Sequence, residues 1–388
     1  MASHSFHNED DVKVIAAVTA TSDDTSAQQD VTLDGQTPTI AYPNGDSYSG
    51  AVLDGQRHGF GVLISADGSR YEGHFENDLK SGHGVQESEN GCHYEGEFLN
   101  DLCHGRGRMV LPDGSVYDGE YDQGVVHGFG RFEADGDVYE GEWVQHLQSG
   151  QGKLTYANGD VYTGGFSEDM RNGQGKFEGA DGEVYEGEYL NDLRHGHGRW
   201  TSAEGDVYEG EFQNDVHCGN GRLQSCIGDV YEGQFANGMK HGQGKMMYED
   251  GSKYEGEHVD DMAHGQGVYV GTDGSQYTGE WVENMQSGRG TLVFANGDMY
   301  EGEFLEDARH GVGKWTYSEE GHTCVYEGAF EDDDMHGPGK LTDDEGVVTE
   351  GVWEQGVFTD SVKAVVESSK DNVVSVDGDT STIAYPNG

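Results

Sequence analysis

The chain has 388 residues, of which only 33% are hydrophobic and 64 are glycine, so a thick hydrophobic core of the usual kind is not expected. Its 74 aspartates and glutamates far outnumber its 22 lysines and arginines, and the formal net charge of −52 argues against binding to nucleic-acid phosphates or anionic lipid headgroups. Five cysteines without a CxxC pair argue against a zinc knuckle or a disulfide framework and fit a reduced cytosol.

Residues 1–35 are polar, acidic and without periodicity, so we expect a disordered acidic arm. The one early apolar run, Val12–Val18, follows an acidic stretch and lacks the basic segment that opens a signal peptide. The sequence contains no apolar stretch of transmembrane length. These features predict a cytoplasmic protein.

Residues 36–357 are dominated by one repeated phrase. Y-x-G recurs every 23 residues, except that the unit at Tyr117 is shorter by one residue and the unit at Tyr300 longer by three. Such a period indicates tandem structural repeats. A partial fourteenth unit lies near Thr349 and lacks the tyrosine. The thirteen full units begin at Tyr48, Tyr71, Tyr94, Tyr117, Tyr139, Tyr162, Tyr185, Tyr208, Tyr231, Tyr254, Tyr277, Tyr300 and Tyr326.

Within each unit the residues alternate with period two, as in a β-strand. In the unit that begins at Tyr94, this residue, Gly96 and Phe98 share one side. A turn follows at Asn100 and Asp101, and a second alternating stretch ends at Met109 before the next turn. Each unit is therefore predicted to be a β-hairpin, and positions are numbered below from its tyrosine.

Glycine stands at the third, twelfth, fourteenth and about the twenty-first positions of each unit. Glycine weakens a strand, so its fixed place needs a reason, and we expect the bare backbone to let neighbouring aromatic rings lie flat over it. A few rings cannot offset the entropy of ordering 23 residues, so the hairpins must stack edge to edge. The predicted fold is all-β, an elongated single-layer antiparallel sheet of tandem hairpins.

The phrase Y-E-G-E-F/W, a polar turn, H-G-x-G and an apolar residue resembles the MORN repeat (membrane occupation and recognition nexus). The resemblance covers Tyr48 to about Trp353. It implies a twisted single-layer sheet with an aromatic groove that takes partner segments, often helical. Members of that family act as scaffolds in cytoskeletal, ciliary and cortical assemblies, and some are regulatory modules of enzymes.

Histidine occupies the eleventh position in eight units and raises the question of metal binding. Equivalent positions in adjacent hairpins lie about 9.6 Å apart, too far for two ligands of one zinc ion, so a turn-closing hydrogen bond is the favoured role. Zinc shared between two chains stays open, and no cofactor is expected. The eight are His58, His104, His127, His195, His241, His264, His310 and His336.

The glutamates that follow each tyrosine predict a solvated face that keeps the sheet soluble, or a surface for a basic protein partner. The sequence contains no EF-hand loop. The H-G-x-G phrase recurs in most units, whereas catalysis would single out one copy, and the sequence lacks the usual nucleophile, kinase and nucleotide motifs. We expect no enzyme activity.

The aromatic stripe is the predicted partner-binding site. A single-layer sheet leaves its apolar face uncovered, and a continuous strip of exposed rings marks an interaction surface. The candidate residues are Tyr94, Phe98, Tyr117, Tyr121, Tyr139, Trp143, Tyr162, Phe166, Tyr185, Tyr189, Trp200, Tyr208, Phe212, Tyr231, Phe235, Tyr277, Trp281, Tyr300, Phe304 and Trp315.

Residues 358–388 form a tail that resembles the start of a second array. Residues 374–388 match residues 31–45 at eleven of fifteen positions, and the first copy leads directly into the first hairpin. We therefore expect a longer, duplicated protein. The predicted function is a non-enzymatic, self-associating scaffold that docks protein segments, with basic or helical partners. Two alternatives are a regulatory module of a larger enzyme, such as a phosphatidylinositol phosphate kinase or a lysine methyltransferase, and a phospholipid-binding tether.

Overall fold

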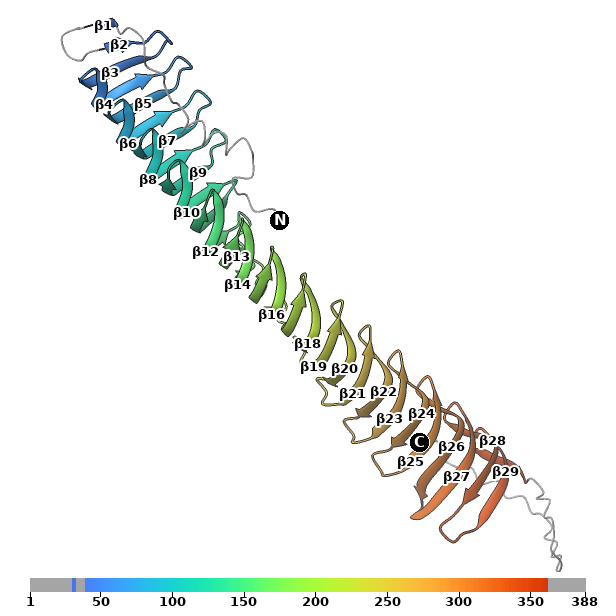
Figure 1. Cartoon of the computed structure of the whole chain (residues 1–388). Coiled ribbons are helices and arrows are strands. Elements are labelled where there is room, and N and C mark those ends of the chain that lie inside the picture. The colour runs from blue at the N-terminus through green and yellow to red at the C-terminus, as the bar shows by residue number, and fades with distance from the viewer. Residues whose placement is uncertain (1–29, 33–38, 362–388) are drawn as a thin grey trace, which may run out of the picture. The chain divides into compact units, whose positions relative to one another are not determined.

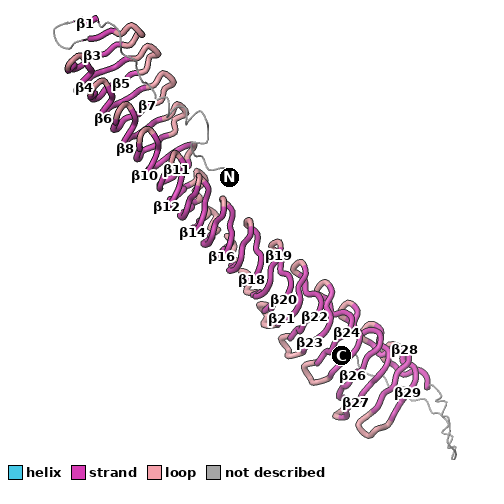
Figure 2. Tube along the Cα trace, in the orientation of Figure 1, coloured by secondary structure: helices cyan, strands magenta, loops and turns pink. Residues whose placement is uncertain are grey.

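The computed structural model describes residues 30–32 and 39–361, and the regular elements in them are all β-strands (Figures 1 and 2). This part of the chain accordingly holds no helix of the length and apolarity needed to cross a bilayer. The chain divides into two compact units, residues 1–203 with 212–215 and residues 204–211 with 216–388. Strand β17 (Val207–Gln213) has residues in both.

In the first unit each strand pairs antiparallel with the strands that precede and follow it in sequence. The result is a single-layer open sheet. Its strands are β1 (Asp30–Thr32), β2 (Thr39–Ala41), β3 (Ser47–Leu53), β4 (Gln56–Ile64), β5 (Arg70–Glu76), β6 (Leu79–Glu87), β7 (His93–Leu99), β8 (Leu102–Val110), β9 (Val116–Asp122), β10 (Val125–Ala134), β11 (Asp137–Val144), β12 (Leu147–Thr155), β13 (Val161–Ser167), β14 (Met170–Glu178), β15 (Val184–Leu190) and β16 (Leu193–Thr201).

The second unit is built in the same way, from consecutive antiparallel pairs. The all-β fold of tandem antiparallel hairpins is thereby confirmed. Its strands are β18 (Val216–Gln224), β19 (Val230–Ala236), β20 (Met239–Met247), β21 (Lys253–Val259), β22 (Met262–Val270), β23 (Gln276–Val282), β24 (Met285–Val293), β25 (Met299–Leu305), β26 (Ala308–Glu319), β27 (His322–Glu331), β28 (Asp334–Thr342), β29 (Val348–Glu354) and β30 (Val357–Ser361).

The sheet extends slightly beyond the repeats at each end. Strand β1 falls inside the predicted arm and pairs with β2, where Val31 lies opposite Ile40. Strand β30 pairs with β29, so the first residues of the predicted tail belong to the sheet. Residues 1–29, most of the arm, and residues 362–388, which hold the second copy of the duplicated segment, lie outside the described residues.

The two strands of a repeat are joined by a two-residue turn with left-handed backbone. At Asn100 and Asp101 the φ angles are 51° and 69°, as a type I′ turn requires, and asparagine and aspartate tolerate this conformation better than most residues. The twist of such a turn matches the twist of the strands, so a polar pair at this place sets the register of each hairpin.

Changes in repeat length are absorbed in the loop that joins one repeat to the next. In a standard repeat this loop closes with the Leu111 amide donating to the Ser115 carbonyl at 2.8 Å. The short repeat instead makes a two-residue turn at Asp135 and Gly136, and the long one extends β26 and β27 to the pair Glu319–His322. The strands themselves keep their register.

A bulge in the second strand explains the glycine at position twelve. Gly96 faces Gly107, but the next residue, Glu97, faces His104, so two residues of the second strand are left over. Gly105 takes φ 63° there. In later repeats the carboxylate at position four accepts the amide of position thirteen, as when Gln151 donates to Glu142 at 2.9 Å. In these repeats one glutamate of the Y-E-G-E phrase therefore closes the bulge.

Glycines at positions three and fourteen form a continuous row across the sheet. Gly96 pairs with Gly107, which pairs on its other side with Gly119. A Cβ added at Gly96 would lie 2.5 Å from both the Cα of Gly107 and the hydroxyl oxygen of Tyr94. The tyrosine ring therefore occupies the space that side chains would fill, as the sequence predicts, and its hydroxyl donates to the Glu97 carbonyl at 2.9 Å.

In most repeats, aspartate carboxylates hydrogen-bond to the backbone of a neighbouring repeat. Asp101 accepts the amide of Lys80, which lies 21 residues earlier, at 2.7 Å. On the other edge Asp137 accepts the amide of Ala157 at 2.8 Å. Both contacts recur along the chain, for example from Gln286 to Asp307 and from Ser318 to Asp298. Part of the large negative charge is therefore built into the backbone hydrogen bonding of the sheet.

Candidate protein-docking face

One side of each sheet carries a ladder of aromatic rings. In the first unit the ring at position one contacts the ring at position five of its own repeat and of the next, edge to face, with centroids 5.0–5.5 Å apart, for example Tyr139 to Trp143 and Tyr139 to Phe166. The second unit repeats the pattern at 4.9–5.2 Å. Edge-to-face contact places the positive ring edge against the negative face of the next ring, which stabilises both beyond simple burial.

The structure places eighteen of the twenty predicted site residues in this ladder and buries them. Their exposed fractions are 6% or less, from Tyr94 at 0% to Trp281 at 6%. Only Trp200 and Trp315 are half-buried. The expectation of an open strip of rings is therefore not met for the eighteen, because the tyrosine ring lies flat on the glycine row and the position-five ring packs against it.

Two other positions supply the accessible surface of this side. On the second strand of a repeat, position sixteen lies opposite the tyrosine, and position ten lies opposite the position-five ring. The pairs Tyr185–Trp200 and Tyr189–Arg194 show this register. From the sixth repeat on, position sixteen is half-buried in every repeat. We call the surface formed by positions one, five, ten and sixteen the ring face. The position-sixteen residues in these eight repeats are Phe177, Trp200, Leu223, Met246, Tyr269, Leu292, Trp315 and Leu341.

Basic residues at position ten lie over the rings. The guanidinium carbon of Arg194 is 5.7 Å from the Tyr185 ring centroid and 5.6 Å from that of Phe212. Its Nη1 pairs with Glu183 at 3.3 Å, and the same carboxylate accepts the Trp200 indole N–H at 2.5 Å. The ring face thus combines half-buried aromatic surface with cations held by cation–π contact.

A second cluster of the same kind lies in the twelfth repeat. The guanidinium carbon of Arg309 is 4.6 Å from the Trp315 ring centroid and 5.8 Å from that of Tyr300. Arg309 also pairs with Asp333 at 3.2 Å. Tryptophan and arginine are the residues most enriched where protein partners bind tightly.

Burial keeps the phenols of the ladder neutral. It raises the pKa of Tyr185 and of Tyr300 to about 12, the nearby arginines Arg194 and Arg309 acting in the opposite direction. Burial likewise raises the pKa of Tyr94. These hydroxyls therefore remain donors to the backbone carbonyl at position four at any physiological pH.

His258 is an aromatic rung in place of phenylalanine. It stands at position five, with its ring centroid 5.0 Å from Tyr231 and 5.1 Å from Tyr254. Burial, with a smaller effect from Lys240, lowers the pKa of this imidazole to about 4. The side chain is therefore neutral near pH 7 and packs as a ring.

The histidines at position eleven are spread along the sheet. Among residues 30–32 and 39–361 no three His, Cys, Asp or Glu side chains gather as metal ligands would. In several repeats the carbonyl of this position accepts the tyrosine hydroxyl, at 3.3 Å for His310 and equally for Ser287. The recurring hydrogen bond thus uses the backbone, which explains why small polar residues replace histidine. Zinc shared between two chains stays the open alternative to this role.

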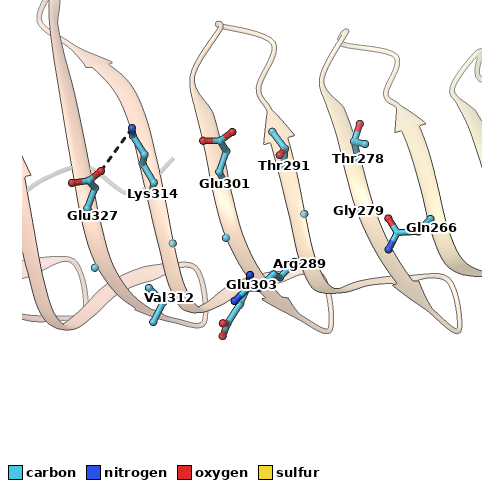
Figure 3. A pocket seen from close by; sticks show the side chains of 14 residues that line it. Gln266, Thr278, Gly279, Arg289, Thr291, Glu301, Glu303, Val312, Lys314 and Glu327 are labelled. Carbon is cyan, nitrogen blue, oxygen red and sulfur yellow. Dashed lines mark ion pairs between the residues drawn. The ribbon is translucent and has the colours of Figure 1, made fainter.

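The opposite side of the sheet is polar. A shallow depression of about 800 Å³ lies there over Gly279, Gly290, Gly302, Gly313 and Gly328 (Figure 3). Figure 3 shows charged side chains of both signs around it, with Lys314 and Glu327 paired at 3.7 Å. Similar pairs occur between positions fifteen and two elsewhere. Such a face is solvated and carries alternating charge.

Sequence reasoning missed the importance of positions eight and ten. At position eight the sequence predicts only a turn residue, whereas the aspartate found there in most repeats also binds the backbone of the preceding repeat. The recurrence of aspartate at position eight is the feature of the sequence that could have indicated this role. Position ten varies among Arg, Lys, Gln, Cys, Val, His, Ala and Met, so its shared location became visible only from the register.

Comparison with known proteins identifies the repeat. The MORN repeat matches this chain thirteen times. A comparison with curated protein sequences gave no match. The matched segments are residues 48–70, 71–93, 94–116, 117–138, 139–161, 162–184, 185–207, 208–230, 231–253, 254–276, 277–299, 300–321 and 326–348.

Two solved structures show a distant likeness to the chain. The TCP10 domain of Danio rerio CPAP is 16% identical, with 52% of this chain and 91% of that chain covered and a TM-score of 0.29. The SAS-4 (dCPAP) TCP domain of Drosophila melanogaster, in complex with a proline-rich motif of Ana2 (dSTIL), is 11% identical, with 48% and 93% covered and a TM-score of 0.24. Scores this low carry no functional argument. The thirteen matched repeats, each folded as a glycine-floored hairpin, show that the chain belongs to the MORN-repeat family.

Proposed function

We propose that this protein is a non-enzymatic scaffold that docks protein segments along its ring face and also associates with itself. The observation that supports this most is the pair of clusters around Trp200 and Trp315, each a half-buried indole beside an arginine. When a partner covers the aromatic surface that the sheet leaves partly accessible, removal of this surface from water contributes favourably to the free energy of binding.

The chemistry of the partner follows from the charges around the ring face. The net charge of −52 favours association with basic segments, and the half-buried rings favour amphipathic helices whose apolar side can cover them. We propose that such segments come from cytoplasmic assemblies of the cytoskeletal, ciliary or cortical kind in which scaffolds of this family act.

The experiment starts from partners found by proximity labelling in cells with the full chain. Each partner is then purified, and its affinity for the wild-type chain and for Trp200→Ala and Trp315→Ala is measured by calorimetry. We expect each substitution to weaken binding by about 1–3 kcal/mol if the partner covers that indole. Arg199→Ala on the polar face is the matched control. Equal affinities of all four proteins would refute docking on the ring face.

A further inference from the structure

On the side of the sheet opposite the ring face, the first repeat differs from all the others. Eight positions of each repeat lie on this side, because they alternate along the strands with the rings and the glycine row. In the first repeat none of them is Asp, Glu, Lys or Arg, whereas every later full repeat carries at least one charged residue there. The eight residues of the first repeat are Ser49, Ala51, Leu53, Gln56, His58, Phe60, Val62 and Ile64.

Five of these residues form an exposed apolar surface, which we call the end patch. Phe60 is 54%, Leu53 53% and Ile64 45% exposed. Ala51 is also exposed, and Val62, which lies between Phe60 and Ile64 on β4, is half-buried. All five come from the single hairpin of β3 and β4, so they share one surface. Apolar side chains gathered in this way, without charges between them, are typical of an interaction site.

Two departures from the repeat pattern create the end patch. Position four is glutamate in eight of the thirteen repeats, whereas Ala51 has no carboxylate with which to close the bulge. Position fifteen is basic from the third to the ninth repeat and pairs with position two, as Arg222 does with Glu232 at 3.1 Å. In the first repeat Val62 lies opposite Ser49 instead. Terminal repeats usually carry a polar outer surface for solubility, so an apolar one at this place needs another reason.

Phe129 offers a comparison within the same chain. It also stands at position thirteen, in the fourth repeat, and is 61% exposed. However, Phe129 lies opposite Glu142, and its amide donates to the Glu120 carboxylate at 3.3 Å. Phe60 lies opposite His74, with the two ring centroids 5.7 Å apart. The same residue at the same position is therefore surrounded by carboxylates in the fourth repeat and by uncharged side chains in the first.

Charge favours a second copy of the chain over a different partner at this surface. Two molecules that each have a formal net charge of −52 repel each other, and contact through the acidic surfaces would bring carboxylates together. At the end patch two copies can meet without placing charged side chains against each other. A basic partner, in contrast, is attracted to acidic surfaces, and the end patch has no acidic side chain.

We propose that two copies of this chain associate through the end patch, with the first repeat of one packed on the first repeat of the other about a two-fold axis. The inference rests on the proposed function, because it names the surface for self-association. The hairpin measures about 20 Å along its strands and about 10 Å across them. Stable complexes bury about 800 Å² on each partner, so the dimer is weak and reversible, with a dissociation constant in the micromolar range.

The test measures the dimer dissociation constant of the full chain by sedimentation equilibrium. Wild type is compared with Phe60→Asp and with the matched control Phe129→Asp, which changes an equally exposed phenylalanine at the same position. We expect Phe60→Asp to raise the dissociation constant about tenfold or more, because it places two unpaired carboxylates in an apolar contact. Phe129→Asp should leave the constant unchanged. Circular dichroism melting curves establish that both variants are folded.

Disulfide trapping tests the symmetry of the contact. Ala51→Cys and the control Ala329→Cys both replace an alanine at position four, in the first and the thirteenth repeat. Both are made in a chain that carries Cys226→Ser, because Cys226 is exposed. After oxidation with copper phenanthroline, linked dimers are quantified by non-reducing electrophoresis. A two-fold axis through the end patch brings the two cysteines of the Ala51→Cys dimer together, so we expect this variant to cross-link several-fold faster than Ala329→Cys.

The possible failures are distinguishable. Equal dissociation constants for wild type and Phe60→Asp would overturn the end patch as the interface and leave self-association to another surface. Faster cross-linking of Ala329→Cys would likewise overturn the proposal and place the contact at the thirteenth repeat. A wild type that stays monomeric at every concentration would overturn both the end patch and self-association. Docking on the ring face would survive each of these results, because it is measured separately with Trp200→Ala and Trp315→Ala.

Discussion

At the scale of single residues, the structure depends on the fit between one tyrosine ring and two glycines. The three atoms nearest to a Cβ added at Gly107 all belong to Tyr94, and two of them lie at 2.5 Å. The same relation recurs along the glycine row. Residue identity at these places is therefore fixed by space, because any side chain must displace the ring that forms the core.

We expect Gly107→Ala to lower the free energy of unfolding by about 1–3 kcal/mol, as overpacking of a core does. The measurement is urea denaturation followed by circular dichroism. In a Tyr94→Ala background the same glycine substitution should cost much less, because the clashing ring is gone. Equal costs in both backgrounds would show that strand propensity, and not the ring, selects glycine.

His258 predicts a pH dependence. Its pKa is lowered from 6.5 to about 4 in the folded chain, so the unfolded chain binds the proton more readily. The stability that this neutral ring contributes is fully present above about pH 6.5 and is lost as pH falls toward 4. His258→Phe should therefore lower the dependence of the melting temperature on pH between 7 and 4.5. If the melting temperatures of the wild type and of His258→Phe differ by the same amount at every pH in this range, protonation of His258 does not contribute to the pH dependence.

At the scale of elements, each hairpin is completed by its neighbours. In most repeats the turn aspartate binds the backbone of the preceding repeat, and in several the loop aspartate binds the following one. The rings contact those of the neighbouring repeats. Hairpins of this length are marginal alone, so these ties supply the cooperativity of the sheet.

Asp307 isolates one such tie, since its carboxylate accepts the Gln286 amide at 2.7 Å and its φ is 70°. Asp307→Asn keeps an acceptor and the backbone preference, so stability should change by less than about 0.5 kcal/mol. Asp307→Gly adopts the positive φ without strain but removes the acceptor of the Gln286 amide. We expect the free energy of unfolding to fall by about 1–2 kcal/mol. Similar unfolding curves for the two variants would mean that the hydrogen bond contributes little.

At the scale of the whole molecule, the described strands pair only with their sequence neighbours, so the architecture is additive. Consecutive repeats present the same register on both edges, as the pairs Gly152–Gly164 and Gly175–Gly187 show. The fold should therefore tolerate the loss or gain of a whole repeat. It should not tolerate a deletion within a repeat that shifts the pairing register of the strands.

Deletion of residues 162–184, one complete repeat, should therefore leave a folded chain whose circular dichroism per residue and melting temperature are close to those of the wild type. Deletion of residues 168–179 removes half a repeat and joins strands out of phase, so it should lower the melting temperature strongly. If both deletions unfold the protein equally, the repeats are not interchangeable units.

The sequence alone determined the period, the hairpin, the glycine floor and the all-β sheet, because each depends on the identity of residues close together in the chain. Tyr94, Gly96 and Gly107 sufficed to predict a ring over bare backbone. Exposure, in contrast, was decided by the tertiary structure. The rings lie flat and cover one another, so from the sixth repeat on the accessible surface of this side passes mainly to positions ten and sixteen, as at Arg194 and Trp200. Burial depends on what packs above a residue, and the residues of one hairpin cannot specify that.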